Sequence, residues 1–530
     1  MKSNLPQIEL YDTTLRDGTQ SQGFVLSVED KLRAAERLDR LGVAFIEGGW
    51  PGSNPRDREF FARVGEIPLK HARIVAFGST HHAGNRPDND PNLAEILNAG
   101  TRVVTLVGKC WALHVTTQLG TSLEHNLEMV RGSVAHLKAQ GREVLFDAEH
   151  FFNSMAGQTE YALAVLDAAV QGGAGTLVLC DTNGGYLPSQ VAEMTRAVAE
   201  RFPDHTLGIH CHNDSECAVA STLAAVEAGA RQVQGTMGGV GERCGNANLC
   251  SIIPALELKM GFVCLPPGQL PLLSETFNFI QELANLRPNP FTPYVGSAAF
   301  SHKGGLHISA VEKDPAMYEH VAPETVGNRR RYLVSDLAGK AAVLRKSQDW
   351  GLGLTADDPR LSAILAELKE RENEGFHYEA AEASFELLMH RAMGREFRYF
   401  DLMGFRVTDY KDHEGQPPLA EATVLLLVDG KVEHTAALGQ GPVNALDRAI
   451  RKALVRFYPQ LVDMRLVDYK VRVLSSADGT AARVRVLIES TDGRNRWGTV
   501  GVSFDVLEAS WQALGDSIRF KLFKDSIRER

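Results

Sequence analysis

Short apolar or β-branched runs alternate with amphipathic helical stretches through the first half of the chain, and this alternation limits the fold more than any other feature. The predicted strands are residues 8–11, 43–47, 73–77, 102–107, 143–148, 176–180, 206–210 and 231–234. Strict alternation of strand and helix over about 250 residues is typical of a (β/α)₈ barrel. An open doubly wound sheet usually has fewer strands and a glycine-rich first turn, and no G-x-G-x-x-G motif follows the first predicted strand. We therefore predict an α/β fold with a TIM barrel.

The first predicted helix has clear boundaries. Ser27 followed by Asp30 is typical of a capping box at a helix start, and Gly42 stands where a C-terminal cap glycine is expected. Apolar residues recur between them at helical spacing. A strand, a helix and a second strand thus follow one another within the first 47 residues.

The pattern changes after residue 265. We predict a catalytic barrel over residues 1–265. Residues 266–415 are predicted to be a linker region with helical subdomains that contributes to the active site, and its helical character is expected to reach about residue 410. Strands return in residues 416–530, where two groups of strands each precede a helix. This order predicts a C-terminal α+β domain built from a loosely duplicated module.

Composition excludes several functions. The chain has 56 Lys and Arg against 66 Asp and Glu, a net charge of −10, so we expect no nucleic-acid partner, because nonspecific binding of nucleic acid depends on basic side chains. No run approaches the roughly 20 apolar residues that span a bilayer, so we expect no membrane insertion. The seven cysteines are odd in number and form no C-x-x-C pair, which predicts reduced thiols in a cytoplasmic protein.

Polar and ionisable side chains collect where five of the predicted strands end. Active sites of this fold lie at the C-terminal ends of the strands, so these side chains are candidate site residues. They are Arg16, Asp17, Glu47, Glu149, His150, Asp181, Thr182, Asn183, His210 and His212.

The most specific feature is His210-Cys211-His212 at the end of a predicted strand. Alternate residues point to one face of a strand, so both imidazoles are expected in the barrel mouth while Cys211 turns away. With Asp17 as a third ligand they form a set that suits Mg²⁺, Mn²⁺, Zn²⁺ or Co²⁺, and Asn246 is placed to bind a metal-bound water or ligand. The alternative is two hydrogen-bonded histidines with a structural role.

Three charged residues have two interpretations each. Arg16 could stabilise a keto or enolate oxygen, or it could form a salt bridge. Glu149 could be a base or a supporting group, and Asp147 shares its strand face. Glu47 could contact substrate or serve as a structural ion-pair partner.

Three segments together resemble the metal-dependent Claisen-condensing enzymes, which include the 2-isopropylmalate, homocitrate and citramalate synthases, with 3-hydroxy-3-methylglutaryl-CoA lyase as a relative. The segments are DTTLRDGTQ (12–20), HCHND (210–214) and GVGERCGN (239–246). The segments CDTNGG (180–185), GGLH (304–307) and GQGPVNA (439–445) are similar to the synthases. YEAAEASFELL (378–388) and DYKVR (468–472) are similar to the long citramalate synthase branch.

The resemblance implies roles for individual residues. A divalent cation would be held by Asp17, His210, His212 and Asn246. Catalytic roles fall to Arg16, Glu149 and His307, the last reaching a barrel from the linker region. The substrate-binding residues that it implies are Arg16, Gln20, Glu47, Thr182 and Tyr318.

The implied activity is that of an acyltransferase. In the citramalate branch acetyl-CoA and pyruvate condense with water to give citramalate and CoA, on a route to isoleucine. The resemblance also implies that isoleucine acts at the C-terminal regulatory domain and that the protein is a homodimer or a higher homo-oligomer. Alternatives are condensation with 2-oxoisovalerate to give 2-isopropylmalate, a C–C lyase, and a noncatalytic amino-acid sensor. The lyase relative has a cysteine directly after paired glycines, where this chain has Val240; the later Cys244 keeps the lyase hypothesis open.

Overall fold

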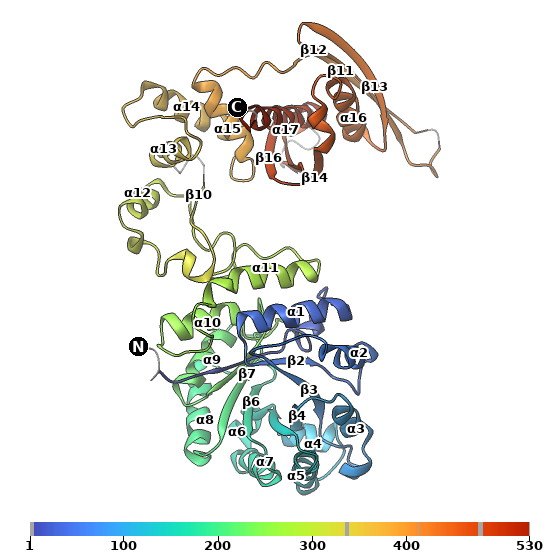
Figure 1. Cartoon of the computed structure of the whole chain (residues 1–530), viewed down its shortest axis with the longest axis vertical. Coiled ribbons are helices and arrows are strands. Elements are labelled where there is room, and N and C mark those ends of the chain that lie inside the picture. The colour runs from blue at the N-terminus through green and yellow to red at the C-terminus, as the bar shows by residue number, and fades with distance from the viewer. Residues whose placement is uncertain (1–4, 334–338, 412, 475–480, 529–530) are drawn as a thin grey trace. The chain divides into compact units, whose positions relative to one another are not determined.

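The computed structural model describes residues 5–333, 339–411, 413–474 and 481–528. It divides into two compact units, the first formed by Met1–Phe300 and Val321–Arg330 and the second by Ser301–His320 and Arg331–Arg530. Figure 1 colours the chain from its N-terminus to its C-terminus.

Strands β1 to β8 of the first unit close into a parallel barrel in chain order. Their bounds are Glu9–Asp12, Phe45–Gly49, Arg73–Ser79, Val103–Lys109, Glu143–Glu149, Thr176–Asp181, Thr206–Cys211 and Gln232–Gly235. The barrel prediction is confirmed, and each predicted strand overlaps the observed one with ends that differ by at most two residues.

Helices surround these strands (Figure 1). In the first unit they are α1 Val28–Leu41, α2 Pro55–Val64, α3 Pro91–Asn98, α4 Ala112–Thr117, α5 Leu123–Ala139, α6 Phe151–Gly157, α7 Thr159–Gly172, α8 Pro188–Arg201, α9 Ala218–Glu227, α10 Leu249–Leu258 and α11 Leu273–Leu283. Short 3₁₀ helices of the chain are η1 Gly18–Gln20, η2 Pro87–Asn89, η3 Leu270–Leu272, η4 Pro315–Met317, η5 Pro323–Val326 and η6 Pro459–Asp463.

The predicted capping of α1 is confirmed. The Ser27 hydroxyl accepts a hydrogen bond from the Asp30 amide at 3.1 Å, and the Asp30 carboxylate accepts one from the Ser27 amide at 3.0 Å. Gly42 ends the helix with φ of 98°. A Cβ at residue 42 would lie 2.2 Å from Cδ of Pro266, so both backbone conformation and space require glycine there.

The barrel interior changes from apolar to polar along the strands. An apolar cluster is formed by Tyr11, Phe45, Val75, Val103 and Leu145. Because side chains alternate along a strand, the residues two positions further on also point inward, and on β2, β4 and β5 these are the buried polar residues Glu47, Thr105 and Asp147. The next step on β5 is Glu149, which lines the cavity described below.

The second unit contains two antiparallel three-stranded sheets, β11-β12-β13 and β14-β15-β16, and each is followed by a helix, α16 or α17. This order confirms the predicted α+β character of the C-terminal part. The strands of the unit are β9 Ser301–His302, β10 Arg331–Tyr332, β11 Asp401–Tyr410, β12 Leu419–Val428, β13 Lys431–Gly439, β14 Arg465–Val473, β15 Val484–Thr491 and β16 Arg496–Ser503. Its α-helices are α12 Gly305–Lys313, α13 Gly339–Asp349, α14 Pro359–Glu374, α15 Glu382–Ala392, α16 Pro442–Leu454 and α17 Val506–Arg528.

The prediction that helical character reaches about residue 410 was wrong for residues 401–410. They form β11, which pairs antiparallel with β12. Its apolar alternation is interrupted at Gly404, beside a register irregularity that begins at Leu402, and Arg406 and Asp409 are exposed. A bulge shifts the side-chain alternation by one residue, so the period of two is lost in the sequence.

Two expectations from composition bear on the described residues. Among their helices, none combines the length and apolar character that a membrane crossing requires. The seven cysteines all lie in described segments and all carry free thiols.

The capping box yields a stability prediction. Ser27→Ala removes the acceptor for the Asp30 amide and should lower the local opening free energy of the first turn of α1 by about 1 kcal/mol. Hydrogen exchange of the Asp30 amide measures this change. Ser27→Thr keeps an acceptor and is the matched control; equal protection in all three proteins would contradict the assigned cap.

Candidate active site

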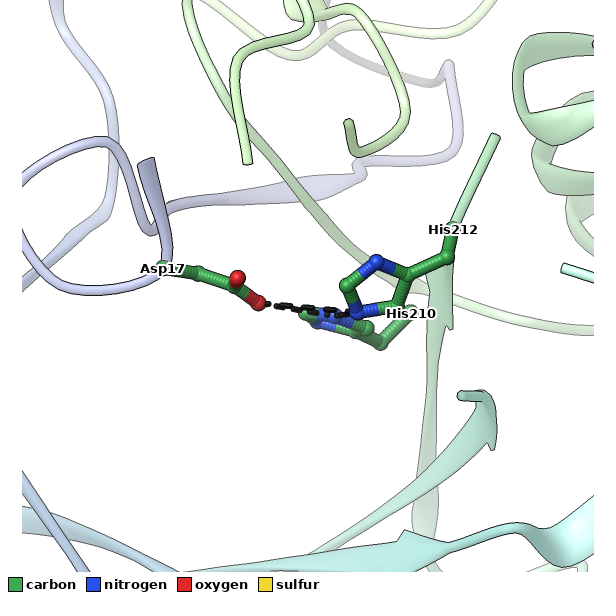
Figure 2. A group of neighbouring side chains, drawn as sticks. All are labelled: Asp17, His210 and His212. Carbon is green, nitrogen blue, oxygen red and sulfur yellow. Dashed lines mark hydrogen bonds and ion pairs between the residues drawn. The ribbon is translucent and has the colours of Figure 1, made fainter. Parts of the chain in front are cut away.

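Asp17, His210 and His212 converge at the C-terminal end of the barrel strands (Figure 2). Oδ2 of Asp17 lies 3.3 Å from Nε2 of His210 and 3.7 Å from Nε2 of His212, and the two imidazole nitrogens are 3.4 Å apart. Asp17 lies in the turn after β1, whereas His210 belongs to β7 and His212 follows that strand. Cys211 packs into the hydrophobic core, as the strand alternation predicted.

The charges of this cluster are strongly coupled. Burial raises the pKa of Asp17, but the Arg16 guanidinium and the His210 imidazole outweigh burial and hold that pKa well below its usual range. Burial and the neighbouring His210 lower the pKa of His212 to about 4. Asp17 is therefore an anion and His212 a neutral donor at neutral pH, as a metal ligand must be. Burial lowers the pKa of His210, but the Asp17 carboxylate outweighs burial and raises that pKa, so a metal ion would displace a proton from His210.

Two buried oxygen atoms without hydrogen-bond partners in the described part of the chain support a cation site here. Among the described residues, Oδ1 of Asp17 and Oδ1 of Asn246 are buried without a hydrogen-bond partner. Asn246 forms an isolated backbone bridge with His212, which brings it to the same end of the barrel. Burying such oxygens without partners is costly, and carboxylate, amide and imidazole donors together match a divalent cation.

Arg16 lies beside this cluster and faces the cavity. Its Nε donates to Oε2 of Glu47 at 2.7 Å, and its guanidinium carbon lies 3.9 Å from the centre of the Phe77 ring. The salt bridge considered for Arg16 is therefore present, and Arg16 also lines the cavity. The ion pair and the aromatic ring fix the direction of the guanidinium.

Glu47 is fully buried and accepts several hydrogen bonds. Its Oε1 accepts from the Tyr11 hydroxyl at 2.7 Å, while its Oε2 accepts from the Thr13 hydroxyl and from Arg16. It is absent from the described residues that line the cavity. Its contacts fit the structural alternative, an ion-pair partner that acts through Arg16, and direct contact with substrate remains a prediction.

Asp147 and Glu149, which the sequence could not separate, have different environments. Asp147 is buried, and burial together with the charge of Glu47 raises its pKa to about 7. Glu149 is partly exposed and its Oε2 lies 2.5 Å from the Lys109 ammonium. The two carboxyl groups therefore differ in depth and in the groups that they contact.

Thr182 follows β6, and its hydroxyl group is held by the backbone amide of His150, a residue in the left-handed conformation. His150 has φ of 57°, and its amide donates to Oγ1 of Thr182 at 2.8 Å. Since Oγ1 accepts this bond, the Thr182 hydroxyl hydrogen is free to donate elsewhere.

A cavity of about 670 Å³ opens at this face of the barrel. It brings together most of the predicted barrel residues: Arg16, Asp17, Gln20, Glu149, Thr182, His210 and His212 all line it. His307 and Tyr318 belong to the second unit, where their rings are 4.2 Å apart, centre to centre, and both are exposed. Their action at a barrel remains a prediction.

A second group of possible ligands is formed by His114, Glu149 and His150. The Lys109 ammonium already occupies the Glu149 carboxylate, and its charge opposes a second cation there. We therefore place the metal centre at Asp17, His210 and His212.

Sequence reasoning missed several residues around the site. Lys109 ends β4, so it could have been found by the same rule that selects ionisable side chains at the C-terminal ends of barrel strands. Phe77 and Gln234 gave no such signal, because an aromatic ring and an amide inside predicted strands are ordinary core or ladder residues.

Known proteins match nearly the whole chain. Family models match as HMGL-like over residues 7–271, homocitrate synthase post-HMGL domain-like over 294–375, and LeuA allosteric (dimerisation) domain over 379–522. The (R)-citramalate synthases of Aquifex aeolicus and Geobacter sulfurreducens are each 53% identical over 98% of both chains. That of Synechocystis is 51% identical over 98% of this chain and 97% of its own. Among solved structures, the HMG-CoA lyase of Bacillus subtilis covers 54% of this chain and 96% of its own at 21% identity and a TM-score of 0.47.

The loop that carries Asn246 yields a prediction for metal binding. A Cβ at Gly241 would lie 2.1 Å from Nδ2 of Asn246, so Gly241→Ala should displace that side chain and weaken Co²⁺ binding by about tenfold. Competition with a chromophoric chelator measures the affinity. Gly65→Ala is the control, because Gly65 has φ of −63° and no neighbour near an added Cβ; wild-type affinity in Gly241→Ala would remove Asn246 from the site.

Proposed function

Because this chain belongs to the (R)-citramalate synthase family, we propose that its barrel condenses acetyl-CoA with pyruvate and water to give (R)-citramalate and CoA. The observation that carries this proposal is the convergence of Asp17, His210 and His212 beside Arg16 at one end of a cavity. When bound there, a divalent cation supplies a Lewis acid that polarises the keto carbonyl.

Arg16 and Thr182 hold the 2-oxoacid. The Arg16 guanidinium faces the keto oxygen and stabilises the negative charge that develops on it when the carbonyl carbon is attacked. Its ion pair with Glu47 fixes it in that direction before substrate arrives. Thr182 donates its hydroxyl hydrogen to the carboxylate of pyruvate, since its oxygen already accepts from the His150 amide.

Glu149 and His307 move the protons. A thioester methyl group is a very weak acid, so its proton must be taken by a base while charge on the enolate oxygen is stabilised. Glu149 lines the cavity and contacts the Lys109 ammonium, which fits it to accept that proton or to orient the group that does. The enolate carbon then bonds to the keto carbon as the C=O π bond breaks, and the keto oxygen takes up a proton through His307. Water hydrolyses the thioester and releases CoA.

The C-terminal domain supports regulation. Its match to the LeuA allosteric (dimerisation) domain supports an allosteric homodimer or higher homo-oligomer. We propose isoleucine as its effector, so that the enzyme serves a pyruvate route to isoleucine. The free thiols of the seven cysteines support a cytoplasmic enzyme.

Thiol release from acetyl-CoA tests the proposal. The metal-loaded protein is assayed in parallel with pyruvate, 2-oxobutyrate, 2-oxoisovalerate and 2-oxoglutarate, with and without isoleucine. We expect the highest kcat/KM with pyruvate and inhibition by isoleucine.

The other outcomes are equally specific. Preference for 2-oxoisovalerate would indicate a 2-isopropylmalate synthase, and absence of thiol release with every acid would contradict condensation and favour a lyase or a sensor. Activity with pyruvate that isoleucine leaves unchanged would retain the reaction and remove the effector.

The Arg16–Glu47 pair provides a test by mutation. Glu47→Gln keeps the size of the side chain but removes the charge that holds Arg16, so kcat/KM for pyruvate should fall by about tenfold or more. Steady-state kinetics with varied pyruvate measures the change. Glu143→Gln removes a half-exposed carboxylate that pairs with Arg73 and should have little effect; wild-type kinetics in Glu47→Gln would show that Arg16 needs no such partner.

A further inference from the structure

His210 is linked to two other buried residues inside the barrel. Its Nδ1 lies 2.9 Å from Oε1 of Gln234, and Nε2 of Gln234 lies 3.3 Å from Oδ1 of Asp147. All three side chains are at most 5% exposed. His210 and Gln234 are register partners on β7 and β8, whereas Asp147 comes from β5.

The direction of these hydrogen bonds follows from their chemistry. Nε2 of Gln234 donates to Oδ1 of Asp147, an oxygen that accepts even when the other oxygen of the carboxyl group is protonated. The carbonyl oxygen of the amide is therefore left to face His210. That oxygen can only accept, so Nδ1 of His210 must carry the hydrogen. In a neutral ring with its hydrogen on Nδ1, Nε2, which faces Asp17 and His212, is the nitrogen that can bind a metal ion.

We propose that Gln234, held by Asp147, is a positioning residue that fixes His210 as its Nδ1–H tautomer and so prepares Nε2 to bind the metal. This inference rests on the proposed function, because that function supplies the metal. Outer hydrogen bonds of this kind orient a ligand and change the affinity of the site.

The two histidines differ in this respect. Within the described part of the chain, Nδ1 of His212 is buried without a hydrogen-bond partner. Loss of Gln234 would therefore leave neither Nδ1 with a hydrogen-bond partner among the described residues. The structure assigns the preorganisation of His210 to one amide.

Gln232 provides a matched control. It lies two residues before Gln234 on the same strand and is equally buried. Its Oε1 has no partner among the described residues, and its Nε2 makes a long 3.4 Å contact with Glu9. It is not among the residues described as lining the cavity.

The test compares Co²⁺ binding by the full-length wild type, Gln234→Leu, Gln234→Glu and Gln232→Leu, through competition with a chromophoric chelator. We expect the dissociation constant of Gln234→Leu to rise by about 10- to 100-fold. Gln234→Glu keeps an acceptor for Nδ1–H, and its carboxyl group can share a proton with Asp147, so it should restore most of the affinity. Gln232→Leu should bind as the wild type does. Equal affinity in wild type and Gln234→Leu would overturn the inference, as would equal losses in Gln234→Leu and Gln232→Leu.

Proton NMR of the Co²⁺-loaded protein gives a readout of the tautomer itself. A hyperfine-shifted, slowly exchanging N–H signal is expected from His210 and should disappear or exchange rapidly in Gln234→Leu. Its absence in a wild type that binds Co²⁺ would overturn the inference and leave the proposed function in place. Failure of the wild type to bind Co²⁺ would instead overturn both.

Discussion

The carboxylate of Asp17 is a buried negative charge, and the arrangement of the barrel mouth depends on how that charge is compensated. Arg16 lies 3.6 Å from it on one side, and two imidazoles lie within 3.7 Å on the other. Arg16 in turn pairs with Glu47, which also accepts hydrogen bonds from Tyr11 and Thr13. A buried charge must be paired and hydrogen-bonded. The charge of Asp17 therefore requires Arg16, and Arg16 in turn connects the site to the buried polar residues inside the barrel.

The alternation of side chains along parallel strands explains how this network is built. On β5, Leu145 belongs to the apolar cluster, Asp147 supports Gln234, and Glu149 lines the cavity. Each step of two residues moves the side chain closer to the C-terminal end of the barrel. The same strand therefore contributes a core residue, a buried support and a candidate proton-transfer residue, at increasing distance from the apolar cluster.

The features that the sequence predicted are those that depend on local residue patterns and on the positions of strand ends. The strand and helix alternation predicted the barrel, and the strand-end position of His210 and His212 predicted the pair that meets Asp17. It did not predict which carboxylate of Asp147 and Glu149 is buried, because both share one face of a strand and only their depth differs. Nor did it predict β11, whose bulge near Gly404 disrupts the alternation, or the role of Gln234, since pairing across a barrel brings together residues 87 positions apart.

The most direct test of this account is the location of metal and 2-oxoacid in crystals of the full-length protein grown with Mn²⁺ and pyruvate. Anomalous diffraction locates the metal independently of any assumption about its ligands. The account predicts an anomalous peak bounded by Asp17, His210 and His212, with the keto oxygen of pyruvate facing Arg16. A peak at His114, Glu149 and His150 instead, or pyruvate bound away from Arg16, would contradict it.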